Sequence, residues 1–282
     1  MFPTDALYSH YSDELARQAE ITIETGTAED TYGVERLVDD NPAHLFKANE
    51  DQVALQFTFA EKTVIGLLAL IHSTLESDDE VVLEADDAAD WVTPAFSAAF
   101  AQTGWVGAGV TRWPHNSWMR PDQEAGYDPT GYLNYRLTFG LDTPLAQNLQ
   151  LGQIRMHPTA RSIYFDRGAR RMRDKPNIEN RTAFRVSTIY PRGTTLYSKS
   201  LAISALDSTQ VVALETQWED VDGRTYPWLW IPDASDPRCY LVRHQTTQEE
   251  FERVVRATSV RPLQIEEVGR GLRPGGPAHE LT

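Results

Sequence analysis

The chain has 282 residues, of which 41% are hydrophobic and 24% are charged, the composition of a globular protein with one or two domains. Its net charge of −15 argues against a nucleic-acid-binding surface, because phosphate binding needs an excess of Lys and Arg. The single cysteine, Cys239, rules out an intramolecular disulfide and favours a reducing compartment, and the longest apolar run, 64–71, is shorter than the ~20 residues of a membrane helix.

The first half of the chain reads as a series of short strands. Its start lacks the basic and apolar regions of a signal peptide. Polar and apolar residues alternate in 20–24 and 52–59, which predicts two half-buried strands. Between them, 34–40 predicts a short helical turn that ends before Pro42. Residues 64–72 are apolar throughout, as in a strand covered on both faces. Further strands are predicted at 81–85, 132–139 and 149–156.

Residues 91–118 form an aromatic segment interrupted by glycines. We expect Trp91 and Trp105 in the core. The loop 112–121 is the best candidate for a ligand surface, because a Trp ring stacks on the apolar face of a sugar while polar neighbours bond its hydroxyls. The alternatives are a subunit interface or a place in the core. The candidate carbohydrate-binding or interface residues are Trp113, His115, Asn116, Trp118 and Arg120.

After residue 158 the character of the chain changes. Strands are predicted at 182–189, 194–204, 228–231, 239–244 and 260–268. The one long helix is predicted over 208–221, with an apolar stripe facing a sheet. Thr247 and Glu250 have capping-box spacing, which predicts a shorter helix over 247–255. Residues 269–282 are rich in Gly and Pro and are expected to fray.

A basic cluster in 161–175 contrasts with the acidic chain around it. One interpretation is a docking site for acidic surfaces of neighbouring subunits, in which unlike charges fix the orientation. The alternative is a solvated hairpin with locally paired charges. The candidate docking residues are Arg161, Arg167, Arg170, Arg171 and Arg173.

No catalytic or cofactor motif emerges from the sequence, so we expect neither an enzyme nor a cofactor. Structural Ca²⁺ is an alternative at the turn that holds Asp39 and Asp40, or in the acidic loop 78–90, because Ca²⁺ takes six to eight oxygen ligands. The competing explanation for Asp39 and Asp40 is a turn in which their side chains accept bonds from nearby backbone N–H groups. The seven histidines have no zinc-site spacing.

The segments 34–48 (VERLVDDNPAHLFKA) and 51–75, together with the strand pair 132–139 and 149–156, resemble the galactose-binding-like (discoidin-type) jelly-roll family. The resemblance covers about residues 20–156. It implies an N-terminal jelly-roll β-sandwich. With the strands and the one long helix predicted after residue 158, the expected fold is mainly β, with a smaller C-terminal α+β domain that is itself a β-sandwich with one main helix. The expected domains are 1–157 including an N-terminal arm, 158–270, and a flexible tail at 271–282.

The whole chain also resembles structural proteins of long-tailed bacteriophages, through 149–156 (LQLGQIRM), the helix around Val211–Trp218, 220–233 and 265–272. This implies a virion protein of the tail tip or baseplate, assembled in the host cytoplasm as a ring with other tail proteins. The jelly roll would face the host, and its expected role there is attachment to surface glycans. Alternatives are a capsid decoration or head fibre, an accessory module of a carbohydrate-active enzyme, or a structural adaptor that binds no sugar.

Overall fold

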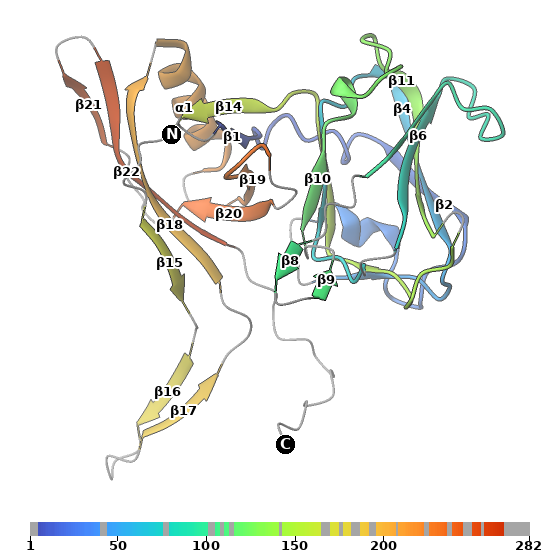
Figure 1. The fold of residues 1–282 in the computed structure, drawn as a ribbon, viewed down its shortest axis with the longest axis horizontal. Coiled ribbons are helices and arrows are strands. Elements are labelled where there is room, and N and C mark those ends of the chain that lie inside the picture. Colours follow the sequence, from blue (N-terminus) through green and yellow to red (C-terminus); the bar gives the residue numbers. More distant parts are fainter. Residues whose placement is uncertain are drawn as a thin grey trace.

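The computed structural model shows a mainly β protein built from antiparallel sheets (Figure 1). Among the residues that it describes there is one α-helix, and no helix is long and apolar enough to cross a membrane. The described residues are 5–39, 44–75, 79–100, 105–107, 110–112, 116–140, 143–164, 170–174, 177–181, 187–191, 196–206, 208–222, 226–235, 239–244, 250–254 and 257–267.

The first unit is a sandwich of two antiparallel sheets. The larger sheet has the strand order β2-β4-β11-β6-β7 and the smaller one β10-β5-β13. The larger sheet consists of β2 (Glu20–Thr25), β4 (Val53–Thr63), β6 (Val81–Asp86), β7 (Phe96–Ala99) and β11 (Tyr132–Phe139). The smaller sheet consists of β5 (Leu67–Ile71), β10 (Ser117–Met119) and β13 (Gln153–His157).

Short helical turns and two-stranded pairs lie in the connections between the strands of the sandwich. They are η1 (Val34–Leu37), η2 (Pro121–Gln123), the pair β3 (Phe46–Lys47) and β12 (Gln150–Leu151), and the pair β8 (Trp105–Gly107) and β9 (Val110–Arg112). The turn that precedes β11 requires Gly131, whose φ is +74°, because a Cβ there would lie 2.2 Å from the Thr63 carbonyl oxygen.

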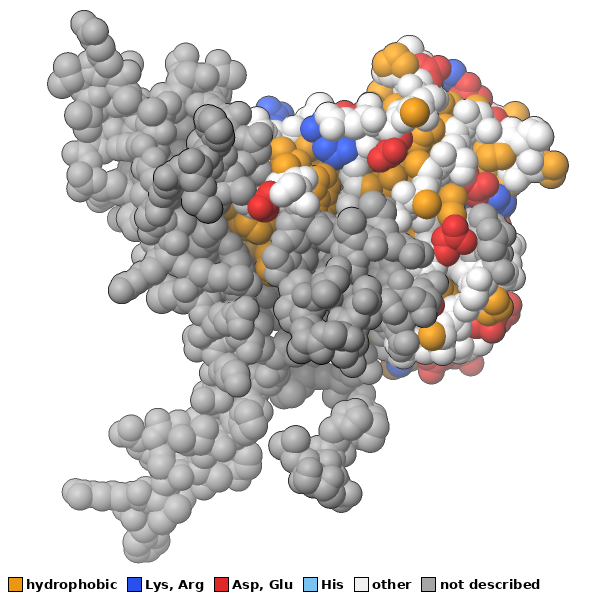
Figure 2. Space-filling view, viewed as in Figure 1, with side chains coloured by type: hydrophobic (Ala, Val, Ile, Leu, Met, Phe, Trp, Pro, Cys, Tyr) orange, Lys and Arg blue, Asp and Glu red, His pale blue; other side chains and the backbone are white. Residues whose placement is uncertain are grey.

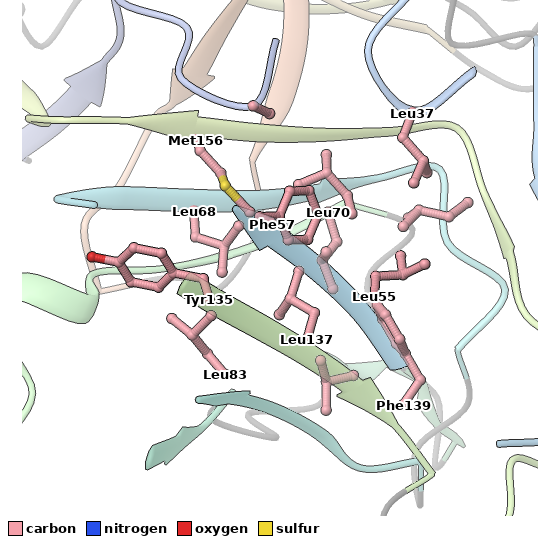
Figure 3. Close-up of a cluster of buried hydrophobic side chains, with 14 of the residues drawn as sticks. Leu37, Leu55, Phe57, Leu68, Leu70, Leu83, Tyr135, Leu137, Phe139 and Met156 are labelled. Atoms are coloured by element: carbon pink, nitrogen blue, oxygen red, sulfur yellow. The ribbon is translucent and has the colours of Figure 1, made fainter. Parts of the chain in front are cut away.

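The sandwich core lies between the two sheets and follows from the period of two along each strand. Leu55 and Phe57 of β4 point inward beside Leu137 of β11 (Figure 3). Leu68 and Leu70 of β5 meet them from the smaller sheet. The inward residues are fully or almost fully buried, so this cluster supplies most of the apolar burial that stabilises the sandwich.

The second unit is an eight-stranded sheet with the order β14-β1-β19-β20-β22-β18-β15, in which β21 also pairs with β22. Its strands are β1 (Asp5–Tyr8), β14 (Arg161–Tyr164), β15 (Arg170–Asp174), β18 (Leu196–Leu206), β19 (Trp228–Ile231), β20 (Tyr240–His244), β21 (Glu250–Val254) and β22 (Ala257–Glu267). The helix α1 (Ser208–Asp220) follows β18, and the hairpin β16 (Asn177–Arg181) and β17 (Ser187–Pro191) extends away from the body (Figure 1).

The two units meet on the outer face of the smaller sheet. Leu67, Ala69 and Ile71 of β5 form a second buried cluster with Leu229 and Leu241 of the second unit. Strand β5 is therefore covered on both faces, as its unbroken apolar run predicts. The outer face of the larger sheet points away from the second unit (Figure 1).

The predicted fold class is confirmed, and so is the helix over 208–221. The helix predicted over 247–255 is wrong, because 250–254 form β21, which pairs antiparallel with β22. Strand β1 at the start of the chain joins the sheet of the second unit between β14 and β19. Leu15 and Ala16, which follow this strand, lie in the sandwich core, so the N-terminal segment contacts both units.

Candidate functional site

The outer face of the larger sheet is mostly polar. Every second residue of its strands points outward, because the residues between them fill the core. We call this surface, together with the indole that lies on it, the Trp91 face. Its residues are Glu20, Thr22, Glu24, Gln56, Thr58, Glu84, Trp91, Asn134, Arg136 and Thr138.

Strand register places the outward residues of neighbouring strands side by side. Arg136 of β11 lies opposite Gln56 of β4 on one side and Glu84 of β6 on the other. Thr22 of the edge strand β2 lies opposite Gln56. A row of polar side chains therefore crosses the sheet at its centre.

The loop after β6 brings Trp91 onto this row. Asp86 accepts hydrogen bonds from the backbone N–H groups of Ala88 and Asp90, at 2.6 and 3.2 Å. Asp90 accepts one from Val92 at 3.1 Å, and this bond lowers the pKa of its carboxyl group. These side-chain bonds replace backbone pairing in the loop, which fixes its course.

The indole of Trp91 is held at its nitrogen and at its ring. Trp91 Nε1 donates to Glu24 Oε1 at 3.0 Å and to Gln56 Oε1 at 3.2 Å. The guanidinium carbon of Arg136 lies 4.8 Å from the ring centroid, a cation–π contact. Trp91 is half-buried.

Arg136 is itself fixed by two carboxylates. Its Nε and Nη2 lie 2.7 Å from Glu84 Oε2, and Glu84 is buried. Its Nη1 lies 3.5 Å from Glu24 Oε2. Hydrogen bonds between charged groups are stronger than those between neutral groups, so Arg136 is held in a fixed position beneath the Trp91 ring.

A chain of hydrogen bonds continues along the face beside Trp91. Gln56 Nε2 donates to Thr58 Oγ1 at 3.1 Å, and Thr58 Oγ1 donates to Asn134 Oδ1 at 3.0 Å. Asn134 Nδ2 then donates to the Asp87 carbonyl at 3.0 Å. The amide groups are thus oriented, with the exposed Glu20 and Thr22 next to them.

The arrangement suits the binding of an amphipathic, hydroxyl-rich ligand. An indole offers an apolar surface to the C–H face of a sugar ring, and oriented amide and carboxylate oxygens accept bonds from its hydroxyls. Trp91 is expected in the core from the sequence, and that expectation is wrong. It is half-buried on the outer face, because the Asp86 and Asp90 caps turn the loop across the sheet.

Three of the residues predicted for a carbohydrate-binding site or an interface lie in the part of the chain that the structure describes. Asn116 is buried between the units, and Trp118 packs against the second cluster at their contact. Arg120 pairs with Asp122, with Nη2 and Oδ2 2.9 Å apart. Trp113 and His115 lie outside the described residues, and they remain predictions.

Four of the predicted docking arginines lie on two strands of the second unit. Arg161 on β14 lies 3.4 Å from Asp13 in an ion pair between Nη2 and Oδ2. Arg170, Arg171 and Arg173 are on β15, the edge strand that pairs with β18. Arg167 lies outside the described residues, and the docking role remains a prediction.

The predicted calcium turn is described only in part. Asp39 Oδ2 lies 2.6 Å from His44 Nδ1, while Asp40 lies outside the described residues. Within the part of the chain that the structure describes, no group of three or more His, Cys, Asp or Glu side chains is placed to hold a metal ion. The calcium alternative therefore stays a prediction.

The sequence matches no protein-family model and no curated protein. Similar solved structures include CBM32-1 from a family 31 glycoside hydrolase of Clostridium perfringens, with a TM-score of 0.33 and 12% identity over 50% of this chain and 98% of that chain. The lectin domain of Lectinolysin complexed with Lewis B antigen has a TM-score of 0.38 and 12% identity over 54% and 99%.

A chitosan-binding module from a chitosanase/glucanase of Paenibacillus sp. IK-5 has a TM-score of 0.35 and 12% identity, over 53% of this chain and 99% of that chain. Each match spans about half of this chain. At these values the matches add nothing to the assignment of the site, which rests on the contacts around Trp91.

Proposed function

We propose that this protein binds glycans without cleaving them, through the Trp91 face. The observation that carries the proposal is the half-buried indole of Trp91, which lies on a polar sheet face between Arg136 and the side chains of Glu24 and Gln56. This combination of an aromatic ring and oriented hydrogen-bonding groups is what a sugar ring requires.

The fixed position of the indole favours binding. A side chain that is already ordered in the free protein loses little entropy when a ligand contacts it. Trp91 has contacts at its nitrogen and at its ring, and its loop is capped by Asp86 and Asp90. The ligand therefore meets a preformed surface.

The orientation of the sandwich also favours this role. The smaller sheet packs on the second unit, and the larger sheet faces the other way (Figure 1). A glycan attached to a cell surface can reach the Trp91 face without meeting the second unit. The sandwich then serves as the binding module and the second unit as its attachment to a larger body.

The first test is the substitution Trp91→Ala. We expect it to weaken binding to any glycan recognised on a printed array by about tenfold or more, since the loss of one aromatic contact of about 1.4 kcal/mol gives that factor. Titration calorimetry with the recognised oligosaccharide measures the change. Val92→Ala is the matched control, because Val92 is the next residue and is 90% exposed. Unchanged affinity of Trp91→Ala beside intact folding contradicts the proposal.

A second candidate function is that of a subunit in an oligomeric assembly, including the virion setting expected from the sequence. The observation that favours it is the hairpin β16–β17, a sheet of two described strands that extends from the body (Figure 1). Two-stranded hairpins are marginally stable alone in water, so a neighbouring subunit is a natural support.

Charge reversal of the basic strand β15 tests this candidate. We expect the purified protein to form oligomers in light scattering, and the triple change Arg170→Glu, Arg171→Glu and Arg173→Glu to lower their mass at moderate salt. Reversal of the exposed charge Lys62→Glu on the other unit is the control, because it also lowers the net charge. A wild-type protein that stays monomeric at all concentrations rules the candidate out.

A further inference from the structure

Residues 9–17, which we call the arm, connect the two units. On the side of the second unit, His10 Nδ1 lies 3.2 Å from Asp220 Oδ2 at the end of α1. Ser12 Oγ donates to the same carboxylate oxygen at 2.6 Å. Tyr11 stacks on Tyr226, with the ring centroids 4.6 Å apart.

On the side of the sandwich, the arm is bound by buried groups. Leu15 and Ala16 enter the sandwich core, and Leu15 N donates to the Met156 carbonyl at 2.7 Å. The buried carboxylate of Glu14 accepts from Met156 N at 2.8 Å and from Arg155 Nη1 at 3.2 Å. Opening the arm therefore breaks contacts with both units.

A buried histidine lies at each end of the arm's contacts, one beside each unit. His157 on β13 is 2% exposed, with its Nε2 3.4 Å from Glu14 Oε2. The charged groups around it are Glu14 and Asp13 of the arm and Arg155 of its own strand, and burial lowers the pKa of His157 below its ordinary value.

His10 has a similar environment at the other end. It is 3% exposed and stacks on Tyr8, and the charged groups around it are Arg161 on β14, Asp13 of the arm and Asp220 on α1. The pKa of His10 is lowered mainly by burial, and secondly by the positive charge of the nearby Arg161.

We propose that the arm is an acid-sensitive joint, a connection between the two units that is closed at neutral pH and opens when the pH falls, while the β5 contact persists. The inference is independent of glycan binding. It rests on two buried histidines enclosed by the contacts that fix the arm.

The direction follows from where protons bind. With the joint closed, both histidines are held neutral, whereas in an opened arm they regain the ordinary pKa of about 6.5. Opening therefore takes up protons below that pH, and the contribution of each histidine to closure is fully present above about pH 6.5 and is lost as the pH falls. Each group changes the opening equilibrium by at most about tenfold per pH unit.

Glu14 does not cancel this effect. Arg155 already contributes a positive charge beside the Glu14 carboxylate, with their atoms 3.2 Å apart. A proton on His157 would place a second positive charge in the same buried space, where its desolvation is costly.

Hydrogen exchange of the full-length protein tests the proposal. The amides of Leu15 and Met156 report the joint directly, because both bonds cross between the arm and β13. We expect their protection factors to fall by up to about tenfold per pH unit for each titrating histidine below about pH 6.5, while amides in the centre of β11 keep theirs.

Single changes His10→Gln and His157→Gln remove the titrating groups, and each is expected to flatten this pH dependence. His44→Gln is the matched control, because the His44 side chain is 55% exposed on a loop of the sandwich. If His157→Gln fails to fold, the wild-type profile and the His10→Gln profile decide. Wild-type protection factors that stay constant through this pH range, or an unaltered slope in His10→Gln, overturn the proposal.

Discussion

At the scale of single residues, Asn116 shows how one amide connects distant parts of the chain. Its Oδ1 accepts from the backbone N–H of His72 at 2.8 Å, and its Nδ2 donates to the Cys239 carbonyl at 3.2 Å. Asn116 is 5% exposed, so both bonds are shielded from water. The side chain thereby joins the end of β5 to the second unit.

Replacing Asn116 tests this connecting role. We expect Asn116→Ala to lower the free energy of unfolding by about 1–3 kcal/mol, because a buried N–H and a buried carbonyl lose their partners. Urea unfolding measures the change. Asn49→Ala, at an exposed amide of the sandwich, is the control. Glycan affinity at the Trp91 face should not change; if Asn116→Ala abolishes binding at full stability, the residue belongs to a ligand site.

Residue chemistry alone leaves such roles undecided. An Asn beside Trp, His and Arg has the donors and acceptors of a sugar site, and equally those of a buried connection. The choice between these roles depends on which residues cover β10. Trp118 of β10 packs against the cluster that holds Leu229 of β19 and Leu241 of β20, and both strands come much later in the chain. The position of Trp91 could not be predicted for a related reason. Hydrogen bonds from backbone N–H groups to the side chains of Asp86 and Asp90 set the course of its loop across the sheet.

At the scale of elements, β5 is the centre of the molecule. Leu68 and Leu70 face the sandwich core, while Leu67, Ala69 and Ile71 face the second unit. All five are fully buried. Because its two faces serve different clusters, the strand couples the sandwich to the second unit.

A charge on the outer face of β5 should uncouple the units. Ala69→Glu places a carboxylate in an apolar contact, which costs on the order of 3–5 kcal/mol when the charge has no partner. We expect calorimetry to show two separate thermal transitions, with the sandwich melting on its own. Thr22→Glu, on the exposed face of the larger sheet, should leave a wild-type profile. A single unshifted transition in Ala69→Glu means that the contact contributes little.

The periodicity of the sequence was enough to predict most strands of the sandwich. Alternation in β4 and the unbroken apolar run of β5 reflect burial that a strand's own residues encode. The helix predicted over 247–255 failed because capping-box spacing is a local preference, and pairing with the long β22 outweighed it in 250–254.

At the scale of the whole molecule, the outer faces of the two sheets of the sandwich have different roles. The outer face of the smaller sheet packs against the second unit. Acidic side chains are spread over the visible surface of the sandwich (Figure 2). The arm adds a second connection, so the direction of the Trp91 face is set by two contacts. Loss of the arm contacts at acid pH would leave the β5 contact alone to hold that direction.

The position of β1 also constrains the order of events during synthesis. Leu7 and Tyr8 pair with Ile231 and Trp230, so β1 leaves the ribosome long before β19 exists, although its other partner strand, β14, is made earlier. The sandwich is complete once β13 has been made, and it can fold while the rest is still being translated. Until β19 arrives, the edge of β1 that pairs with it stays unpaired, and this pairing joins strands far apart in the sequence at the entropic cost of closing a long loop.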